Sequence, residues 1–295
     1  MQIKKALITA AGFGTRFLPA TKTIQKEMLP ILNRPLIDYV VSDCVEAGIE
    51  EIVFVVSEYN KQLMHFYSEN QRLYNYLERM GKLDMYDRIA KLHNQAKFTF
   101  IHQSDSDQYG TAVPVRVAQK ELENEDAFLV FMGDDFIYNE DGRCEASSMM
   151  DQFKQSGASA LVTCIRKPRA ELSRYGVAEV KQEGGFTYLK NLVEKPAPGK
   201  EPSDLINISK YVLTPAIFDV IAHQDVNPDS GELYITDSVT TLAQTQPVVI
   251  YTPNGRYLDG GNVLEWLKTN IIVAKNQPEL RQGLRAFVQE EFKLD

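Results

Sequence analysis

The chain has 295 residues, enough to bury a full core in one large domain or in two fused ones. It is 44% hydrophobic and 24% charged, as is usual for a globular enzyme, and its net charge is −8. This negative balance argues against a nucleic-acid partner, which usually requires a basic surface, so an anionic small ligand must be held by local cations.

The cysteines and the first residues indicate a reducing compartment. Cys44, Cys144 and Cys164 form no Cys-x-x-Cys pair, and their odd number makes no disulfide framework. Residues 1–5 lead straight into an apolar run, which leaves no room for a signal peptide, and no run approaches the roughly 18 residues of a membrane span. We therefore expect a soluble, cytoplasmic protein without a membrane partner.

A phosphate-binding loop is predicted near the start of the chain. Residues 6–10 form a short apolar run that is typical of a buried parallel strand. Gly12 and Gly14 follow, and their lack of a Cβ lets the backbone bend tightly and approach a ligand. Arg16 and Lys26 add cations that can hold phosphate oxygens. The segment predicts a triphosphate cradle.

Two common glycine motifs do not fit this loop. A dinucleotide fingerprint needs a third glycine near Phe17, and a Walker loop needs Gly-Lys-Ser/Thr after Gly14; neither is present. A plain strand and turn with an exposed arginine remains an alternative on the loop alone.

The rest of the chain alternates between strand and helix patterns. Helical spacing from Leu36 to Ala47 and the apolar run 52–56 complete a parallel strand–helix–strand unit. Residues 59–95 are predicted to be almost wholly helical, with a break at Gly81, and Gly184-Gly185 predicts an antiparallel hairpin. Further strands are expected at 98–101, 127–132, 160–165, 207–213 and 248–251, and helices at 112–121, 146–155, after Pro215, after 231–237, and from 262 to 292 with an interruption at Pro278. The pattern predicts one α/β domain with a mixed sheet.

Two acidic residues stand where strands are expected to end. Asp134 follows a buried strand and a glycine, and Asp259 precedes Gly260-Gly261. In open α/β sheets ligands bind at this edge, and two converging carboxylates would suit Mg²⁺ with substrate phosphates as further ligands. A turn or a helix cap is the alternative. The pair Glu194-Lys195 at the end of the hairpin is, without context, a solvated surface ion pair.

The string from Ala6 to Pro30 resembles the signature of the sugar-1-phosphate nucleotidylyltransferases. Within that family, Lys26-Glu27-Met28-Leu29-Pro30 is similar to the bacterial UTP–glucose-1-phosphate uridylyltransferases, or UDP-glucose pyrophosphorylases. The resemblance covers nearly the whole chain and implies a Rossmann-like, mainly parallel mixed sheet flanked by helices. We expect a single domain: 1–135 mainly nucleotide-binding with a helical insertion at 60–95, 160–261 mainly sugar-phosphate-binding with a small antiparallel portion, and 262–295 a helical tail.

Carried over residue by residue, the resemblance also implies a site. It assigns catalytic roles to Arg16, Lys26 and Lys195, and a Mg²⁺ ion to Asp134 and Asp259. Within the substrate-binding set, the amide of Gln103 would read the uracil edge, Gly110 would allow close approach of the base, and Glu194 would bind glucose hydroxyls. The substrate-binding set is Ala11, Gly12, Gly14, Thr15, Glu27, Gln103, Gly110, Gly176 and Glu194.

The implied reaction joins UTP and glucose 1-phosphate to give UDP-glucose and pyrophosphate. Departures from the family pattern at Gln25, Thr111, Ser209-Lys210 and Glu265-Trp266 leave other nucleotides and sugar 1-phosphates open, dTTP and galactose 1-phosphate among them. A non-catalytic regulatory paralogue is a second alternative. A glycosyltransferase is a third; it would need an Asp-x-Asp metal motif, and the only nearby match, Asp105-Ser106-Asp107, stands in a polar loop with no apolar strand directly before it. We further expect a homo-oligomer, either a dimer or a tetramer.

Overall fold

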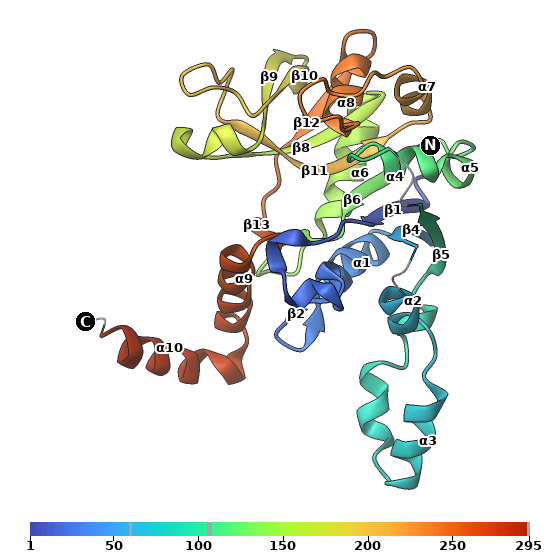
Figure 1. Cartoon of the computed structure of the whole chain (residues 1–295), viewed down its shortest axis with the longest axis vertical. Helices are drawn as coiled ribbons and strands as arrows, with labels where there is room; N and C mark the ends of the chain where they lie inside the picture. The colour runs from blue at the N-terminus through green and yellow to red at the C-terminus, as the bar shows by residue number, and fades with distance from the viewer. Residues whose placement is uncertain (59–60, 105–107, 294–295) are drawn as a thin grey trace.

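The computed structural model describes residues 1–58, 61–104 and 108–293. Its centre is a nine-stranded sheet with the order β5-β4-β1-β6-β11-β8-β12-β10-β9 (Figure 1). The strands of this sheet are β1 (Lys5–Ala10), β4 (Glu51–Ser57), β5 (Lys97–Gln103), β6 (Phe128–Met132), β8 (Ala160–Arg166), β9 (Gly176–Glu183), β10 (Phe186–Glu194), β11 (Leu205–Leu213) and β12 (Val248–Tyr251).

The sheet is mixed. Strand β1 runs parallel to β4 and β6, and β4 runs parallel to β5, so the four strands nearest the start of the chain form a parallel half. Strand β11 is antiparallel to β6 and β8, and β9 and β10 form the predicted antiparallel hairpin. The expected mixed, mainly parallel sheet with a small antiparallel portion is confirmed.

Helices cover both faces of the sheet because the central strands are apolar on both sides. In β1, Ile8 packs in one core and Leu7 in the other. The first core is covered by α1 (Leu36–Glu46) and α6 (Glu145–Ser156). The second is covered by α4 (Val113–Val117), α7 (Ala216–Ala222) and α8 (Ile235–Ala243). The helix predicted over 112–121 is divided at Ala118 into α4 and α5 (Gln119–Leu122).

The insertion after β4 is less helical than predicted. It contains α2 (Gln62–Phe66), α3 (Gln71–Arg79) and two 3-10 segments, Leu83–Arg88 and Leu92–Asn94. The prediction of an almost wholly helical 59–95 is therefore wrong: the segment is a series of short pieces. Few of its side chains are buried, so no long apolar face holds one helix together. Figure 1 shows α3 projecting from the body of the molecule.

Two small ribbons flank the sheet. Strand β7 (Asp135–Tyr138) pairs antiparallel with β13 (Arg256–Asp259), and this register sets Asp135 opposite Asp259. Strands β2 (Pro30–Ile31) and β3 (Arg34–Pro35) form the second ribbon. The β7–β13 pair brings together two chain segments that carry the predicted metal ligands.

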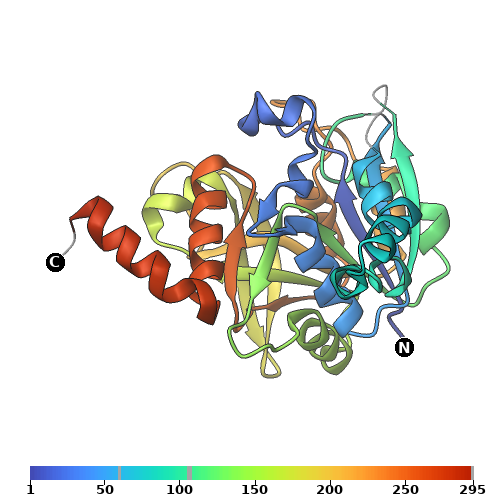
Figure 2. The same cartoon turned by 90° about the horizontal axis from the view of Figure 1, so that it is seen from below.

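The tail consists of α9 (Val263–Lys275) and α10 (Pro278–Phe292), as predicted, and α10 extends away from the body (Figures 1 and 2). Within the described ranges, no helix has the length and apolar character needed to cross a membrane. The Asp105-Ser106-Asp107 motif lies outside the described residues.

Candidate functional site

The predicted phosphate loop follows β1 at the carboxyl end of the parallel strands. Gly14 adopts a left-handed backbone (φ 63°), and its carbonyl accepts a hydrogen bond of 2.8 Å from Thr21 Oγ1. A Cβ on Gly12 would stand 3.4 Å from Lys26 Cε, so the lysine stem packs directly on the loop backbone. The loop is therefore fixed by its own turn and by Lys26. Thr15 follows it as an exposed residue.

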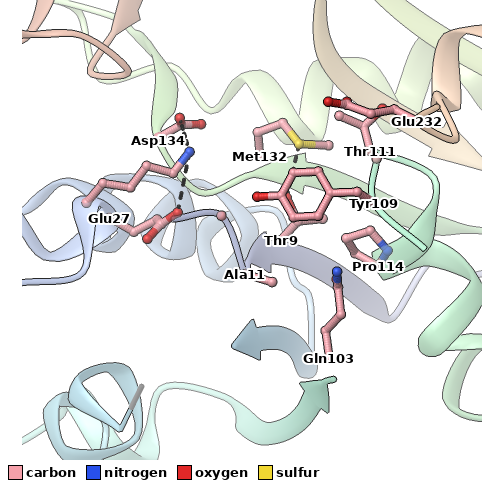
Figure 3. A pocket seen from close by; sticks show the side chains of 13 residues that line it. Thr9, Ala11, Glu27, Gln103, Tyr109, Thr111, Pro114, Met132, Asp134 and Glu232 are labelled. Carbon is pink, nitrogen blue, oxygen red and sulfur yellow. Dashed lines mark hydrogen bonds and ion pairs between the residues drawn. The ribbon is translucent and has the colours of Figure 1, made fainter. Parts of the chain in front are cut away.

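Lys26 lies between the carboxylates of Asp134 and Glu27, both labelled in Figure 3. Its Nζ is 2.6 Å from Asp134 Oδ2 and 3.7 Å from Glu27 Oε1. Burial acts to lower the pKa of Lys26, but the charges of Asp134 and Glu27 outweigh it and hold that pKa above its ordinary value. Burial raises the pKa of Glu27 to about 7, and its Oε2 is buried without a hydrogen-bond partner among the described residues. Lys26 is thus a fully charged cation in the pocket.

Asp134, Asp259 and Arg16 converge on the backbone of Gly261. The point where a Cβ on Gly261 would stand is 3.0 Å from Asp259 Oδ1, 3.3 Å from Asp134 Oδ2 and 3.8 Å from Arg16 Nη1. Burial acts to raise the pKa of Asp134, but the Lys26 ammonium outweighs it, so the net shift is downward and Asp134 remains ionised. Burial raises the pKa of Asp259, and the hydrogen bond from Gly261 N (2.6 Å) partly offsets this.

These two aspartates match the donor set of a hard cation. Mg²⁺ is usually held by one or two carboxylates while substrate phosphates and water complete the octahedron. Among residues 1–58, 61–104 and 108–293, no group of three or more His, Cys, Asp or Glu side chains forms a metal-binding cluster. The arrangement fits an ion that takes most of its ligands from the substrate.

Asp135, the neighbour of Asp134, points into the protein and not into the pocket. It pairs with Lys210, which is 2% exposed, at 2.6 Å, and Lys210 Nζ also donates to the Asp135 carbonyl at 3.0 Å. Burial raises the pKa of Asp135 to about 7 against the effect of this lysine. The buried pair fixes the turn that presents Asp134, and sequence reasoning noted Lys210 only as a departure from the family pattern.

The other end of the pocket has the features expected of a base site. Gln103 lies at the end of β5, and its Oε1 is buried without a partner in the described part of the chain. Gly110 packs so closely on Leu233 that a Cβ would stand 2.3 Å from the Leu233 carbonyl oxygen, and its φ is 129°. The pocket that joins these features to the phosphate loop is lined by Thr9, Ala11, Gly12, Lys26, Glu27, Gln103, Tyr109, Gly110, Thr111, Pro114, Met132, Asp134 and Glu232.

The predicted sugar residues meet at the open end of the β9–β10 hairpin. Glu194 pairs with Gly176 across the two strands, and a Cβ on Gly176 would stand 3.0 Å from Glu194 Oε2. Burial raises the pKa of Glu194 against the effect of Lys195, whose Nζ is 3.8 Å from Glu194 Oε1. Lys195 itself has a left-handed backbone (φ 45°) and a side chain that is 60% exposed.

Thr236 is a candidate ligand-binding residue that sequence reasoning missed. Its Cγ2 is 3.7 Å from the point where a Cβ on Gly176 would stand, and its Oγ1 is buried without a partner among the described residues. It follows Ile235, whose N–H donates to Thr111 Oγ1 at 3.0 Å, so one segment connects the Thr111 side of the pocket to Gly176. The motif Tyr234-Ile235-Thr236-Asp237 was visible in the sequence only as the approach to a helix.

The structure therefore brings the predicted residues together in two neighbouring groups. Seven line the pocket, namely Ala11, Gly12, Lys26, Glu27, Gln103, Gly110 and Asp134. Arg16 and Asp259 join them through Gly261, whereas Gly176, Glu194 and Lys195 form the second group. Gly14 and Thr15 are not among the lining residues; Gly14 shapes the turn.

Comparison with known proteins gives the same family. The model of the family described as nucleotidyl transferase matches residues 5–276, and such enzymes generally use a divalent metal ion. The chain is 35% identical over 290 residues to a UTP–glucose-1-phosphate uridylyltransferase of Staphylococcus epidermidis, covering 98% of each chain.

Solved structures agree. A UTP-bound UGPase from Acinetobacter baumannii is 29% identical with a TM-score of 0.86, covering 98% of this chain and 99% of that one. A UDP-glucose pyrophosphorylase complexed with UDP-glucose is also 29% identical, with a TM-score of 0.83 and coverage of 94% and 100%. With a family model that matches residues 5–276 and a relative 35% identical over nearly its full length, this chain belongs to the nucleotidyl transferase family.

Proposed function

We propose that this chain transfers the uridylyl group of UTP to glucose 1-phosphate, giving UDP-glucose and pyrophosphate. The observation that carries the proposal is the convergence of Arg16, Asp134 and Asp259 at Gly261, with Asp134 also lining the pocket that contains Gln103. The Gln103 end of the pocket would take the base, the loop with Arg16 and Lys26 the triphosphate, and Glu194-Lys195 the sugar phosphate. The relatives that bind UTP and UDP-glucose support this assignment.

In the proposed reaction, an oxygen of the sugar phosphate attacks the α-phosphorus of UTP in line. The new bond joins that oxygen to phosphorus, and the bond from the α-phosphorus to the bridging oxygen breaks as pyrophosphate leaves. A phosphate monoester is largely ionised at neutral pH, so no general base is required. The protein therefore acts mainly through positioning and charge neutralisation.

Each residue would have a separate part in this step. Arg16 and Lys26 would hold the triphosphate. The Lys26 ammonium, which donates a hydrogen bond to Asp134, would also donate to phosphate oxygens. Lys195 would neutralise the sugar phosphate, while Glu194 would accept hydrogen bonds from glucose hydroxyls. The Oε1 of Gln103, which has no partner among the described residues, would accept a hydrogen bond from the uracil edge, and its NH₂ group would donate one.

We propose Mg²⁺ as the ion held by Asp134 and Asp259, because both offer hard oxygen donors at one place. When bound, such an ion neutralises negative charge on phosphate oxygens.

A pyrophosphate-release assay tests the reaction directly. The protein would be given UTP, dTTP, CTP or ATP, each with glucose 1-phosphate or galactose 1-phosphate, in the presence of Mg²⁺. We expect the highest kcat/KM with UTP and glucose 1-phosphate. A higher value for dTTP or galactose 1-phosphate would establish a different substrate, and no release with any pair would favour the non-catalytic alternative.

We also propose that the chain forms a homo-oligomer in which α10 contacts a second copy. None of the side chains of α10 is buried in the described chain, although Leu280, Phe287 and Phe292 are large and apolar. These exposed apolar side chains are what a second copy of the chain would cover. Light scattering after gel filtration should give a dimer or a tetramer, and a monomer would contradict the proposal.

A further inference from the structure

Two exposed aromatic rings, to which the site described so far gives no role, stack on each other: Tyr109 lines the pocket that contains Gln103, and Phe13 contacts Tyr109 from the phosphate loop. Phe13 lies between the two loop glycines, and Tyr109 precedes Gly110. Their ring centroids are 6.0 Å apart and their planes differ by only 8°. Phe13 is 59% exposed and Tyr109 is 45% exposed, so the rings cover each other only in part.

Both rings are carried by fixed backbone. The Tyr109 carbonyl accepts a hydrogen bond of 2.8 Å from Leu233 N, and the next residue, Gly110, packs tightly on Leu233. Phe13 is held in the Gly14 turn by Thr21. Anchored backbone leaves the side chains as the parts that can adjust, which lowers the entropy lost when a ligand is ordered between them.

The position of the pair suits a flat ligand. Tyr109 lines the same pocket as Gln103, and Figure 3 shows its ring extending over the space among the other lining side chains. Stacked planes lie about 3.5 Å apart, so a flat ring between two others needs about 7 Å. The 6.0 Å is the distance between the ring centroids, which exceeds the distance between the planes when stacked rings are offset, so the two exposed rings must rotate apart to admit a base.

We propose that Phe13 and Tyr109 form an aromatic clamp that receives the faces of the nucleotide base. The inference rests on the proposed function, because it assumes that this pocket takes UTP. Gln103 would read the edge of the base, whereas the clamp would hold its faces. Because every base has an aromatic face, the clamp adds affinity without setting the nucleotide ranking.

Binding measurements without sugar phosphate test the clamp apart from catalysis. We would measure Kd for UTP, CTP and tripolyphosphate by calorimetry, at one fixed Mg²⁺ concentration, for Phe13→Leu, Tyr109→Leu and Tyr109→Phe. Tyr76→Leu serves as a matched control because Tyr76 is similarly exposed (51%) but lies on α3 in the insertion. Melting temperatures would show that each variant is folded.

We expect both leucine variants to weaken UTP and CTP by the same factor, about 5- to 150-fold, as for the loss of one base–aromatic stack. Tripolyphosphate has no base, so its Kd should not change, and Tyr109→Phe and Tyr76→Leu should bind UTP as the unmodified protein does. Unchanged UTP affinity in both leucine variants would overturn the proposal. A loss in only one of them, or an equal loss of tripolyphosphate, would overturn it as well.

Failure of the proposed function gives a different result. If the unmodified protein prefers dTTP, the substrate assignment fails, but the effect of Tyr109→Leu on dTTP still decides whether the clamp exists. If no nucleotide binds, both proposals fall.

Discussion

Replacing Lys195 by methionine separates a surface ion pair from a substrate contact. The Lys195 ammonium is 3.8 Å from Glu194 Oε1, and its side chain is 60% exposed. Methionine keeps most of the apolar stem and removes the charge. We expect Lys195→Met to leave the melting temperature and the KM for UTP unchanged and to lower kcat/KM for glucose 1-phosphate sharply.

The size of the effect follows from the two kinds of contact. An exposed ion pair is worth about 0–1 kcal/mol, since water and salt screen it, so stability should hardly change. A charge-assisted contact to phosphate is worth roughly 1.5–3 kcal/mol, which corresponds to about 10- to 150-fold in kcat/KM.

The assay is a kinetic titration of each substrate while the other is saturating. Lys200→Met is the matched control, because Lys200 is an exposed lysine in the following loop. Lys195→Gly adds a second test: glycine adopts the left-handed backbone at this position (φ 45°) without strain, so this variant should be as stable as the unmodified protein and equally impaired.

Three results would refute the reasoning. An unchanged kcat/KM for glucose 1-phosphate would show that Lys195 makes no contact with the substrate. An equal loss for both substrates would indicate general damage to the protein. An equal loss in Lys200→Met would show that the effect is one of overall charge.

Four further expectations concern the pocket. Gly261→Ala should fold normally but lose at least about 100-fold in turnover, because its methyl group would stand 3.0 Å from Asp259 Oδ1 and 3.3 Å from Asp134 Oδ2; normal turnover would contradict this arrangement. Asp134→Asn and Asp259→Asn should each raise the Mg²⁺ concentration needed for half-maximal turnover by at least about tenfold, and an unchanged metal titration would remove the residue from the metal site. Gln103→Ala should reduce the preference for UTP over other nucleotides by about fivefold, the value of one net hydrogen bond of about 1 kcal/mol, with little change in the highest rate; an unchanged ranking would count against base reading. Glu27, whose pKa burial raises to about 7, binds its proton more tightly in the folded state, so its contribution to stability is full below pH 4.5 and is lost as the pH rises through 7. Urea titrations at pH 4.5 and pH 8 should therefore show that the unfolding free energy of the unmodified protein falls by about 3 kcal/mol more over this range than that of Glu27→Gln. An equal fall in both proteins would disprove the raised pKa of Glu27.

Local patterns in the sequence determined most of the elements. Apolar runs of four to six residues predicted the strands of the parallel half, and Gly184-Gly185 predicted the β9–β10 hairpin. Pro278 predicted the break between α9 and α10. These features depend on a few neighbouring residues, so they can be recognised without knowing the fold. The segment 59–95 was predicted wrongly because its apolar residues are widely spaced. Such spacing does not show which of them pack against the rest of the protein.

In the candidate site, too, some features could be predicted from the sequence and others depend on the tertiary structure. The sequence placed Asp134 at the end of a strand, but it could not say why Asp134 and not Asp135 faces the pocket. Tertiary structure decides this, because Lys210 from β11 holds Asp135 inward. The approach of Thr236 to Gly176 and the pairing of Phe13 with Tyr109 likewise join segments about 60 to 100 residues apart. Side-chain periodicity reports which face of an element is buried, whereas contacts between distant segments depend on strand order and register, and only the folded chain sets these.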